Sequence, residues 1–452
     1  MLDRPDVLFI VLDSVRRERV SKHGHDRETT PTLDAFADIA TQFEQAYAPA
    51  PWTLPSHSSM FTGLTPSEHG VTNGFSDRTP RLPDGVSTLA ERLSEREYRT
   101  AGFSNNPWVG QLTGLDRGFE EFVEWDLEIS HSADSALHSR TDRLYSRLHK
   151  LLGQAARQPV FVLKRPFFTS SLVDRATRWL DHAVDRDAPT LTFLNLMEAH
   201  SPYFPPDQAF RSLGLDAPNP IEPRMLNTKL LAYVMGKTDL NPALRERVME
   251  YYDASLRYED AKVKALFETL RANGTFDETL IVVCSDHGKT LGEFDRDGTP
   301  PHYLRDINVS VPLLVKLPFQ TSPRRVDSPF ELATLHDLVL DPSEETLTGP
   351  DREFALVEDS IPHTGKTSED VTRWRVVARG EDSYLRAEDG RSFVLRGRGA
   401  DEAAVDADRS TVQQFEGALD RRIDELGGRA RDHSEGEMNR DVQRQLRDLG
   451  YM

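Results

Sequence analysis

The stretch Val7-Leu8-Phe9-Ile10-Val11-Leu12-Asp13 decides the fold of this chain. It consists of six apolar residues that end at a carboxylate. Runs of this length that are rich in Val, Ile and Leu are typical of strands buried on both faces of a parallel sheet. Two later runs, Leu191–Met197 and Leu280–Cys284, have the same character. The three runs together predict the centre of an open α/β sheet.

Polar side chains follow each of these runs at the point where the strand should end. Glu198 and His200 come after the second run, and Asp286 and His287 come after the third. Open α/β sheets bind ligands beyond the carboxyl ends of their strands. We therefore expect Asp13, His200, Asp286 and His287 to meet at one edge of the sheet, where they would form a site.

The overall composition indicates an acidic globular protein with a large core. The chain has 452 residues, of which 38% are hydrophobic, and a net charge of −19 from 74 acidic and 55 basic side chains. Such an acidic protein is not expected to bind nucleic acid. The single cysteine, Cys284, excludes an intramolecular disulfide and lies in an apolar run, where a buried side chain is expected.

The sequence also predicts where the protein is located. No apolar run reaches the roughly 20 residues of a membrane span. The first strand begins close to Met1, so we expect no signal peptide and a cytoplasmic protein.

The order of patterns along the chain predicts two parts. Residues 1–340 should form a mixed, mostly parallel sheet flanked by helices, and residues 345–452 a small C-terminal α+β subdomain that ends in a charged helix. The predicted helices of the first part are Leu33–Ala40, Ser56–Gly63, Val86–Glu95 and Tyr251–Asn273, and its further strands are Thr100–Ser104 and Val309–Lys316; short strands at Arg375–Ala378 and Ser383–Ala387 belong to the second part.

A basic insertion interrupts the first part at about residues 130–180. Between His138 and Arg178 the chain has nine Arg or Lys residues and two Asp residues, in contrast to the acidic remainder. One interpretation is a solvated helical insertion that balances the acidic body. The other is a cap that contacts an anionic substrate, or a membrane surface through residues 138–178.

The residues at the predicted sheet edge permit metal-assisted chemistry. Asp13, Asp286 and His287 offer two carboxylates and an imidazole, which are suitable ligands for a divalent cation. Thr53 is the candidate nucleophile because coordination by a metal can activate its hydroxyl group, although a Thr before Leu-Pro is more often a turn or cap residue. His200 and His302 could donate hydrogen bonds to an anionic substrate or protonate a leaving group.

Four separated motifs resemble those of the sulfatase family of the alkaline phosphatase superfamily, over roughly residues 4–320. The opening stretch from Arg4 to Ser14 is similar to the first strand and first metal carboxylate of that family. The segment Pro51–Gly63 is similar to its nucleophile motif, Ser285-Asp286-His287-Gly288 followed by Leu291-Gly292-Glu293 to its second metal motif, and Val309–Val315 to its Val-Pro-Leu strand. The resemblance implies an alkaline-phosphatase-like fold and an ester-cleaving enzyme.

Three departures from the family pattern alter what the resemblance implies. Sulfatases convert a Cys or Ser to formylglycine, but this chain has Thr53, which cannot give an aldehyde. His57 replaces the Arg of the same motif, and Asp13-Ser14 replaces a pair of adjacent carboxylates. A metal-bound Thr is instead similar to the nucleophile of the phosphodiesterases, phosphonate hydrolases and transferases of the superfamily.

The resemblance therefore implies the following site. One divalent ion, which could be Mn, Zn, Ca or Mg, would be held by Asp13, Thr53, Asp286 and His287, with a second ion held by His200 and His302 as an alternative. The catalytic residues would be Thr53, His200 and His302, and the substrate-binding residues His57, Asn106 and Lys289, although Asn106 could equally be a structural turn residue.

We expect a hydrolase or transferase that cleaves a phosphate or sulfate ester through Thr53, with a phosphodiester-type substrate favoured. The expected partner is an anionic ester linked to a glycan or a lipid. One alternative is a sulfuric ester hydrolase that works without formylglycine. Another is a non-catalytic relative that binds an anionic glycan or lipid through the basic insertion.

Overall fold

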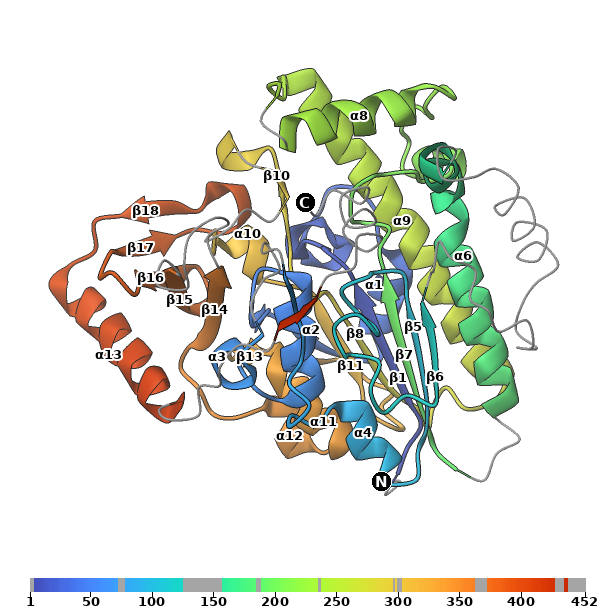
Figure 1. Cartoon of the computed structure of the whole chain (residues 1–452), viewed down its shortest axis with the longest axis horizontal. Coiled ribbons are helices and arrows are strands. Elements are labelled where there is room, and N and C mark those ends of the chain that lie inside the picture. Colours follow the sequence, from blue (N-terminus) through green and yellow to red (C-terminus); the bar gives the residue numbers. More distant parts are fainter. Residues whose placement is uncertain are drawn as a thin grey trace.

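An eight-stranded sheet forms the centre of the protein (Figure 1). The computed structural model describes residues 4–71, 78–124, 157–183, 188–234, 237–295, 297–298, 303–361, 372–426 and 435–437. The strand order of the central sheet is β12-β2-β11-β8-β1-β7-β5-β6. Its strands are β1 (Val7–Leu12), β2 (Thr41–Phe43), β5 (Arg99–Ser104), β6 (Glu121–Glu124), β7 (Thr190–Leu196), β8 (Leu280–Cys284), β11 (Leu313–Lys316) and β12 (Arg324–Val326).

The three apolar runs of the sequence occupy the middle of this sheet. Strand β1 pairs in parallel with β7 on one side and with β8 on the other, and Val11 lies opposite both Asn195 and Cys284. Every residue of the three strands is buried. Along β1, alternate side chains enter two different hydrophobic clusters, one on each face of the sheet. The prediction of doubly buried parallel strands is therefore confirmed.

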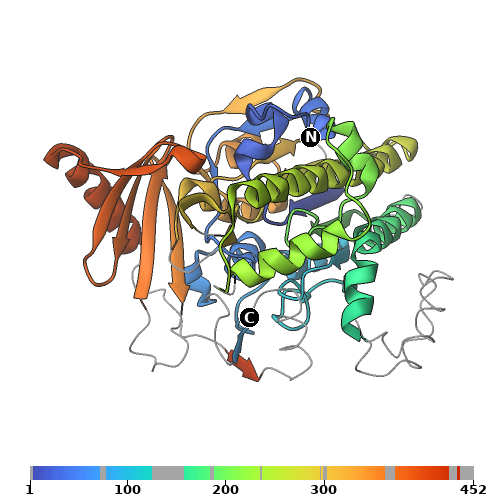
Figure 2. The same ribbon diagram turned by 90° about the horizontal axis from the view of Figure 1, so that it is seen from above.

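Helices cover both faces of the sheet (Figure 2). One hydrophobic cluster joins the sheet to α1 (Pro31–Ala37), α6 (Arg157–Ala183) and α9 (Pro242–Ala272), and the other joins it to α2 (Thr53–Thr62), α4 (Leu89–Ser94) and α11 (Leu335–Leu340). Together with the strand order, these layers confirm the predicted mixed, mostly parallel α/β sheet flanked by helices. Shorter helices are α3 (Pro66–His69), α7 (Asp207–Ser212), α8 (Glu222–Val234), α10 (Asp306–Val309) and α12 (Glu344–Thr348).

Several predicted boundaries differ from the structure, and the differences at α2 and β11 have identifiable reasons. The helix expected from Ser56 begins at Thr53, since Pro55 falls in its first turn, where a missing N–H group is tolerated. The strand expected over Val309–Lys316 is wrong at its start: α10 occupies Asp306–Val309, and β11 begins only after Pro312. Strand β11 then runs antiparallel to β8, which makes the sheet mixed.

An antiparallel sheet of five strands lies beside the central sheet (Figure 1). Its order is β14-β15-β16-β17-β18, and helix α13 (Arg409–Leu426) packs on it through Phe415, Ala418 and Leu419. The strands are β14 (Ala355–Ile361), β15 (Thr372–Arg379), β16 (Asp382–Ala387), β17 (Ser392–Arg396) and β18 (Ala403–Val405); short pairs join β9 (Thr290–Leu291) to β10 (Asp297–Gly298), β3 (Ala46–Tyr47) to β13 (Phe330–Glu331), and β4 (Arg78–Pro80) to β19 (Glu435–Glu437).

The basic insertion is described only from its second half. Residues 125–156 lie outside the described part of the chain, and α6 begins at Arg157. The two interpretations of residues 138–178 therefore remain predictions. Among the helices that the structure describes, no stretch combines the length and the apolar character that crossing a bilayer requires.

Candidate metal centre and active site

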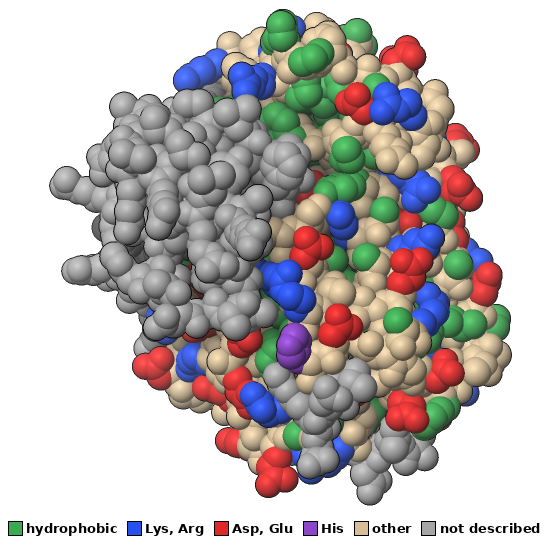
Figure 3. All heavy atoms as spheres, turned by 90° about the vertical axis from the view of Figure 1, so that its right-hand side faces the viewer, with side chains coloured by type: hydrophobic (Ala, Val, Ile, Leu, Met, Phe, Trp, Pro, Cys, Tyr) green, Lys and Arg blue, Asp and Glu red, His purple; other side chains and the backbone are tan. Residues whose placement is uncertain are grey.

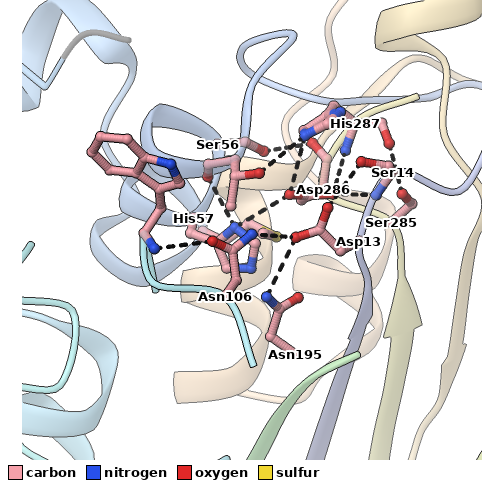
Figure 4. A network of polar contacts seen from close by, with 12 residues as sticks. Asp13, Ser14, Ser56, His57, Asn106, Asn195, Ser285, Asp286 and His287 are labelled. Carbon is pink, nitrogen blue, oxygen red and sulfur yellow. Dashed lines mark hydrogen bonds and ion pairs between the residues drawn. The ribbon is translucent and has the colours of Figure 1, made fainter. Parts of the chain in front are cut away.

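Two carboxylates and an imidazole meet at the carboxyl ends of β1 and β8 (Figure 4). Asp13 directly follows β1, and Asp286 and His287 follow β8 after one intervening serine. Each of the three offers a ligand atom, these atoms lie within 4.8 Å of one another, and all three side chains are buried. The structure thus brings together Asp13, Asp286 and His287, the three residues at strand ends that were predicted to lie close together and that could hold a metal ion.

Hydrogen bonds from neighbouring residues fix the two carboxylates. The Ser14 N–H group donates to Asp286 Oδ1 at 3.0 Å, and the Ser14 hydroxyl donates to Asp13 Oδ1 at 2.9 Å. Asn106 Nδ2 donates to Asp13 Oδ2 at 2.7 Å, and Asn195 Nδ2 approaches the same oxygen at 3.4 Å. Donors of this kind orient a carboxylate before a metal binds to it.

The protonation of His287 suits a metal ligand. Its Nδ1 atom lies 2.7 Å from the carbonyl oxygen of Gly288. Since a carbonyl oxygen only accepts hydrogen bonds, Nδ1 carries the hydrogen, and the Nε2 lone pair of the neutral ring points into the site. Burial lowers the pKa of His287, which favours this neutral form.

The electrostatics of the carboxylate pair also fit a divalent cation. Burial and the nearby charge of Asp13 raise the pKa of Asp286 well above its usual value. Burial opposes ionisation of Asp13 as well, but His200, His287 and His57 outweigh it and lower the Asp13 pKa. Asp286 Oδ2 is buried and accepts no hydrogen bond within the described part of the chain. A divalent ion would supply positive charge to the pair and a partner to Asp286 Oδ2.

Thr53 is the first residue of α2, and its side chain faces the ligand set. Its Oγ1 atom lies 3.1 Å from His287 Nε2, and the residue is completely buried. The Ser56 hydroxyl, one turn along the helix, donates to the carbonyl oxygen of Asp286 at 2.7 Å. This bond ties the start of α2 to the loop after β8 and so holds Thr53 at the site.

His57 lies beneath the same site among aromatic rings. Its Nδ1 atom is 2.9 Å from the Thr53 carbonyl oxygen and 3.5 Å from Asp286 Oδ2. The ring packs edge-on against Phe61 and Phe193, and burial lowers its pKa to about 4. The structure therefore places a neutral imidazole where the family motif has an Arg. Whether His57 contacts substrate remains a prediction.

The other predicted site residues lie at different depths around the centre. Asn106 bridges Asp13 and the N–H group of Trp108, which bonds to Asn106 Oδ1 at 2.9 Å. Lys289 is buried, with its ammonium group 5.3 Å from the centre of the Tyr203 ring. His200 Nδ1 lies 2.6 Å from the Ser201 carbonyl oxygen. His302 falls outside the described residues.

Sequence analysis missed three supporting residues, namely Ser14, Asn195 and Ser285. The Ser285 hydroxyl accepts from the Val15 N–H group and donates to the His287 carbonyl oxygen, both at 2.8 Å, so it joins the loops after β1 and β8. Asn195 was read only as part of an apolar strand. Ser14 stands where the family has a second carboxylate, and the sequence predicts for it at most a hydroxyl ligand, not the hydrogen bonds that it donates to the two carboxylates. A polar residue inside or directly after a buried strand is the signal that could have pointed to all three.

Comparison with known proteins agrees with this geometry. The sulfatase family model matches residues 5–340. A protein described as a sulfatase from Formosa agariphila is 24% identical over 372 residues, which cover 75% of this chain and 69% of the relative. An arylsulfatase from Klebsiella aerogenes is 26% identical over 329 residues, covering 66% of this chain and 69% of the relative.

Solved structures show the same fold. The crystal structure of the phosphonate monoester hydrolase of Agrobacterium radiobacter superposes with a TM-score of 0.71 at 18% identity, covering 94% of this chain and 96% of that one. The family match spans the strands and loops that carry Asp13, Thr53, Asp286 and His287. The chain therefore belongs to the sulfatase family, in the alkaline phosphatase superfamily, and is an ester hydrolase of that family.

Proposed function

We propose that this protein is a metal-dependent hydrolase or transferase in which Thr53 attacks a phosphate or sulfate ester, with a phosphodiester-type substrate favoured. The observation that carries the proposal is the position of Thr53 Oγ1, 3.1 Å from His287 Nε2 at the start of α2. Threonine is a secondary alcohol, so its oxidation cannot give the aldehyde of formylglycine. The hydroxyl itself is therefore the proposed nucleophile.

Asp13, Asp286, His287 and Thr53 would hold one divalent cation. Their oxygen and imidazole donors do not distinguish Mn, Zn, Ca or Mg. When bound, the ion would lower the pKa of the Thr53 hydroxyl and neutralise charge on the ester oxygens. Ser14 and Asn106, which donate to the two carboxylates, would keep the ligand oxygens in place.

The proposed reaction has two displacements at one phosphorus atom. Thr53 Oγ1 forms a bond to phosphorus while the bond to the leaving oxygen breaks; the Thr53 proton passes to solvent water, and the leaving oxygen takes a proton from His200. Water or an acceptor alcohol then gives a proton to His200 as it attacks the phosphothreonine, and Thr53 Oγ1 departs with a proton from solvent water. His200 would protonate the leaving oxygen through Nε2 as an imidazolium, because Nδ1–H already donates to the Ser201 carbonyl oxygen. His302 is proposed as a second donor.

The charge of the site favours a substrate that carries one negative charge. Two carboxylates balance a divalent ion, and the buried Lys289 ammonium group adds one positive charge. Phosphodiesters, phosphonate monoesters and sulfate monoesters are all tetrahedral monoanions, whereas phosphate monoesters carry up to two charges at neutral pH. The similarity to a phosphonate monoester hydrolase and to arylsulfatases supports this class.

Two alternatives compete with this proposal. The names of the curated relatives favour a sulfuric ester hydrolase that uses Thr53 directly. A non-catalytic binder of anionic glycans or lipids would retain the fold without turnover. The intact set of Asp13, Asp286 and His287 argues against the second alternative, because loss of activity is usually accompanied by loss of a ligand.

The test compares wild type, Thr53→Ala and Thr53→Ser, each loaded with Mn²⁺ or Zn²⁺, on matched aryl substrates. The substrates are a phosphodiester, a sulfate monoester and a phosphate monoester. We expect phosphodiester turnover that falls at least about a thousandfold in Thr53→Ala and is partly retained in Thr53→Ser, which keeps a hydroxyl. Mass spectrometry of an acid-quenched reaction should find the adduct on the peptide that contains Thr53.

The other possible results of this assay would contradict the proposal or support one of its alternatives. Sulfate turnover that depends on Thr53 would make the protein a threonine sulfatase. Turnover that Thr53→Ala leaves unchanged would contradict the nucleophile assignment. No turnover of any substrate, with an acceptor alcohol present, would favour the binding protein.

A further inference from the structure

Helix α8 exposes an unusual number of large apolar side chains. Six large hydrophobic residues are exposed in the described part of the chain, and four of them, Ile221, Met225, Leu231 and Val234, lie on or directly before this helix. The opposite face of α8 already contributes Leu226 and Leu230 to the core. The outer apolar residues are therefore in excess of what the fold needs, and a patch of this kind commonly marks a contact surface.

The charges on the same surface are basic. Arg224 and Lys229 are exposed on either side of Met225, the first as its neighbour and the second one turn further on. The single acidic residue of the helix, Glu222, forms an ion pair with Arg247 Nε at 2.6 Å. In a chain with a net charge of −19, this helix thus presents a cationic and apolar surface.

The helix is fixed to the segment that carries His200. Asn227 accepts the N–H group of Tyr203 at 2.7 Å and donates to the Tyr203 carbonyl oxygen at 2.8 Å. The Tyr203 ring in turn lies 5.3 Å from the Lys289 ammonium group, two residues after His287. In Figure 1, α8 lies at the top of the molecule, toward which β7 points, and Figure 2 shows it beside α9.

The side view agrees with an uncovered surface. In Figure 3, hydrophobic side chains lie next to basic ones and to a few acidic ones at the upper end of the face, at the level of α8. A helix with an exposed apolar side, interleaved Lys and Arg, and no free acidic residue has the pattern of helices that lie in the plane of a membrane interface.

We propose that α8 is a docking helix for an anionic lipid surface and that it holds the active-site edge of the sheet toward that surface. The charges on α8 favour a lipid surface over a second copy of the chain as its binding partner. A symmetric contact between two copies would bring Arg224 and Lys229 close to the same residues of the other copy, whereas anionic headgroups complement their positive charges. This contact differs from the membrane contact predicted for residues 138–178. It needs no turnover, so it stands or falls separately from the proposed reaction.

The test is flotation of the full-length protein with phosphatidylglycerol vesicles and, in parallel, with phosphatidylcholine vesicles at moderate salt. We expect binding to the anionic vesicles only. Arg224→Gln/Lys229→Gln should weaken it about 25-fold, from two basic residues near the surface. Met225→Glu/Leu231→Glu should weaken it about a hundredfold or more, because apolar anchors are replaced by repelled charges. Phe319→Glu and Phe393→Glu, at exposed apolar residues elsewhere, are the matched controls and should bind as wild type.

The readouts separate docking from misfolding. The circular dichroism and unfolding temperature of Met225→Glu/Leu231→Glu should equal those of wild type, since both side chains are exposed. Failure of the wild type to float with phosphatidylglycerol, or equal flotation of this double variant, would overturn the proposal. A wild-type dimer in sedimentation velocity that the double variant abolishes would also overturn it, by assigning the helix to a second copy of the chain.

Discussion

Ser14 shows how a single residue can organise the candidate metal centre. Its φ angle of 64° lies in the left-handed region, which is uncommon for a residue with a Cβ atom. In that conformation its N–H group reaches Asp286 while its hydroxyl group reaches Asp13. Such strain persists where surrounding contacts impose it, and it is typical of functional sites. Ser14 therefore links the two carboxylates that a cation would bind.

Substitution of Ser14 by Ala and by Gly separates its two contributions. Both variants lose the bond from the hydroxyl to Asp13 Oδ1, so we expect about tenfold weaker metal binding in each. Only Ser14→Gly also relieves the left-handed strain, so it should be about 1 kcal/mol more stable than Ser14→Ala. Competition with a coloured chelator measures the first effect, and urea unfolding of the metal-free proteins measures the second. Unchanged metal affinity in both variants would contradict this role.

The sequence alone predicted which residues meet at the site but not how they interact. Asp13, Asp286 and His287 could be predicted because strand ends in an α/β sheet share one edge. The orientation of Ser14 could not, because a positive φ at a serine has no sequence signature. The burial of His57 was also not foreseen, since it depends on Phe61 and Phe193, which come from different elements.

Helix α9 places a row of buried acidic residues behind the sheet. Asp253 binds Arg19, His25 and Arg27, and Asp260 accepts the N–H groups at the start of α1. Glu259 differs from both: its Oε1 accepts only the Glu198 N–H group at 3.3 Å, and its Oε2 has no hydrogen-bond partner in the described part of the chain. Burial and the charge of Glu198 raise the Glu259 pKa well above its usual value.

The extent of α9 illustrates what periodicity can and cannot predict. Apolar spacing located Tyr251–Asn273, but the helix begins at Pro242. Its first turns interleave charged residues with Leu244 and Val248, which are four residues apart and pack in the same cluster as Tyr251, so the apolar period extends further than the prediction followed it. The start was nevertheless marked, because Asn241 caps the helix through Leu244 N–H and Pro242 occupies the first helical position.

Glu259→Gln should change how stability depends on pH. The raised pKa means that the folded state binds a proton more readily than the unfolded chain. The free energy of unfolding of the wild type therefore falls as pH rises from the unfolded value, about 4.5, toward the folded one. The amide cannot ionise, so the unfolding temperature of Glu259→Gln should equal that of wild type near pH 4.5 and exceed it increasingly toward pH 8. Thermal unfolding of both proteins, measured at several values between about pH 4.5 and pH 8, tests this prediction.

A control on the same helix isolates the effect of burial. Glu246→Gln removes the charge of an exposed residue of α9. A difference between Glu259→Gln and wild type that stays constant with pH, as for a change of surface charge far from any buried group, would show that Glu259 does not bind the additional proton in the folded state.

At the scale of the whole molecule, the C-terminal sheet braces the segments around Thr53. The N–H group of Glu358 in β14 donates to the Pro49 carbonyl oxygen at 2.9 Å, four residues before Thr53. Its carboxylate accepts the Ser67 N–H group at 2.9 Å and the Arg375 Nε–H group at 2.7 Å. Ordered motifs predicted the fold class, but contacts between residues about three hundred positions apart follow only from the tertiary structure. The division of the chain at residue 340 remains a prediction.

Loss of the Glu358 charge should therefore lower the stability of the folded protein. Burial opposes ionisation, but Arg375 and Ser67 outweigh it and lower the Glu358 pKa. The lowered pKa means that the stabilisation is complete above about pH 4.5, the usual value, and is lost as pH falls through the folded pKa. At pH 7, Glu358→Gln leaves Arg375 without its buried carboxylate. The free energy of unfolding, measured by urea denaturation, should therefore be about 3 kcal/mol lower than that of wild type.

Comparison with a surface pair makes this last prediction specific. Glu353 is exposed and pairs with Arg379 at 2.9 Å, so Glu353→Gln should change stability by less than about 1 kcal/mol. Since the Glu358 carboxylate holds Ser67, Glu358→Gln should also lower turnover while metal binding at Asp13, Asp286 and His287 stays unchanged. If Glu358→Gln and Glu353→Gln were equally stable at pH 7, the C-terminal sheet would not brace the segments around Thr53. Equal loss of turnover and of metal binding would instead mean that the disturbance reaches the metal ligands themselves.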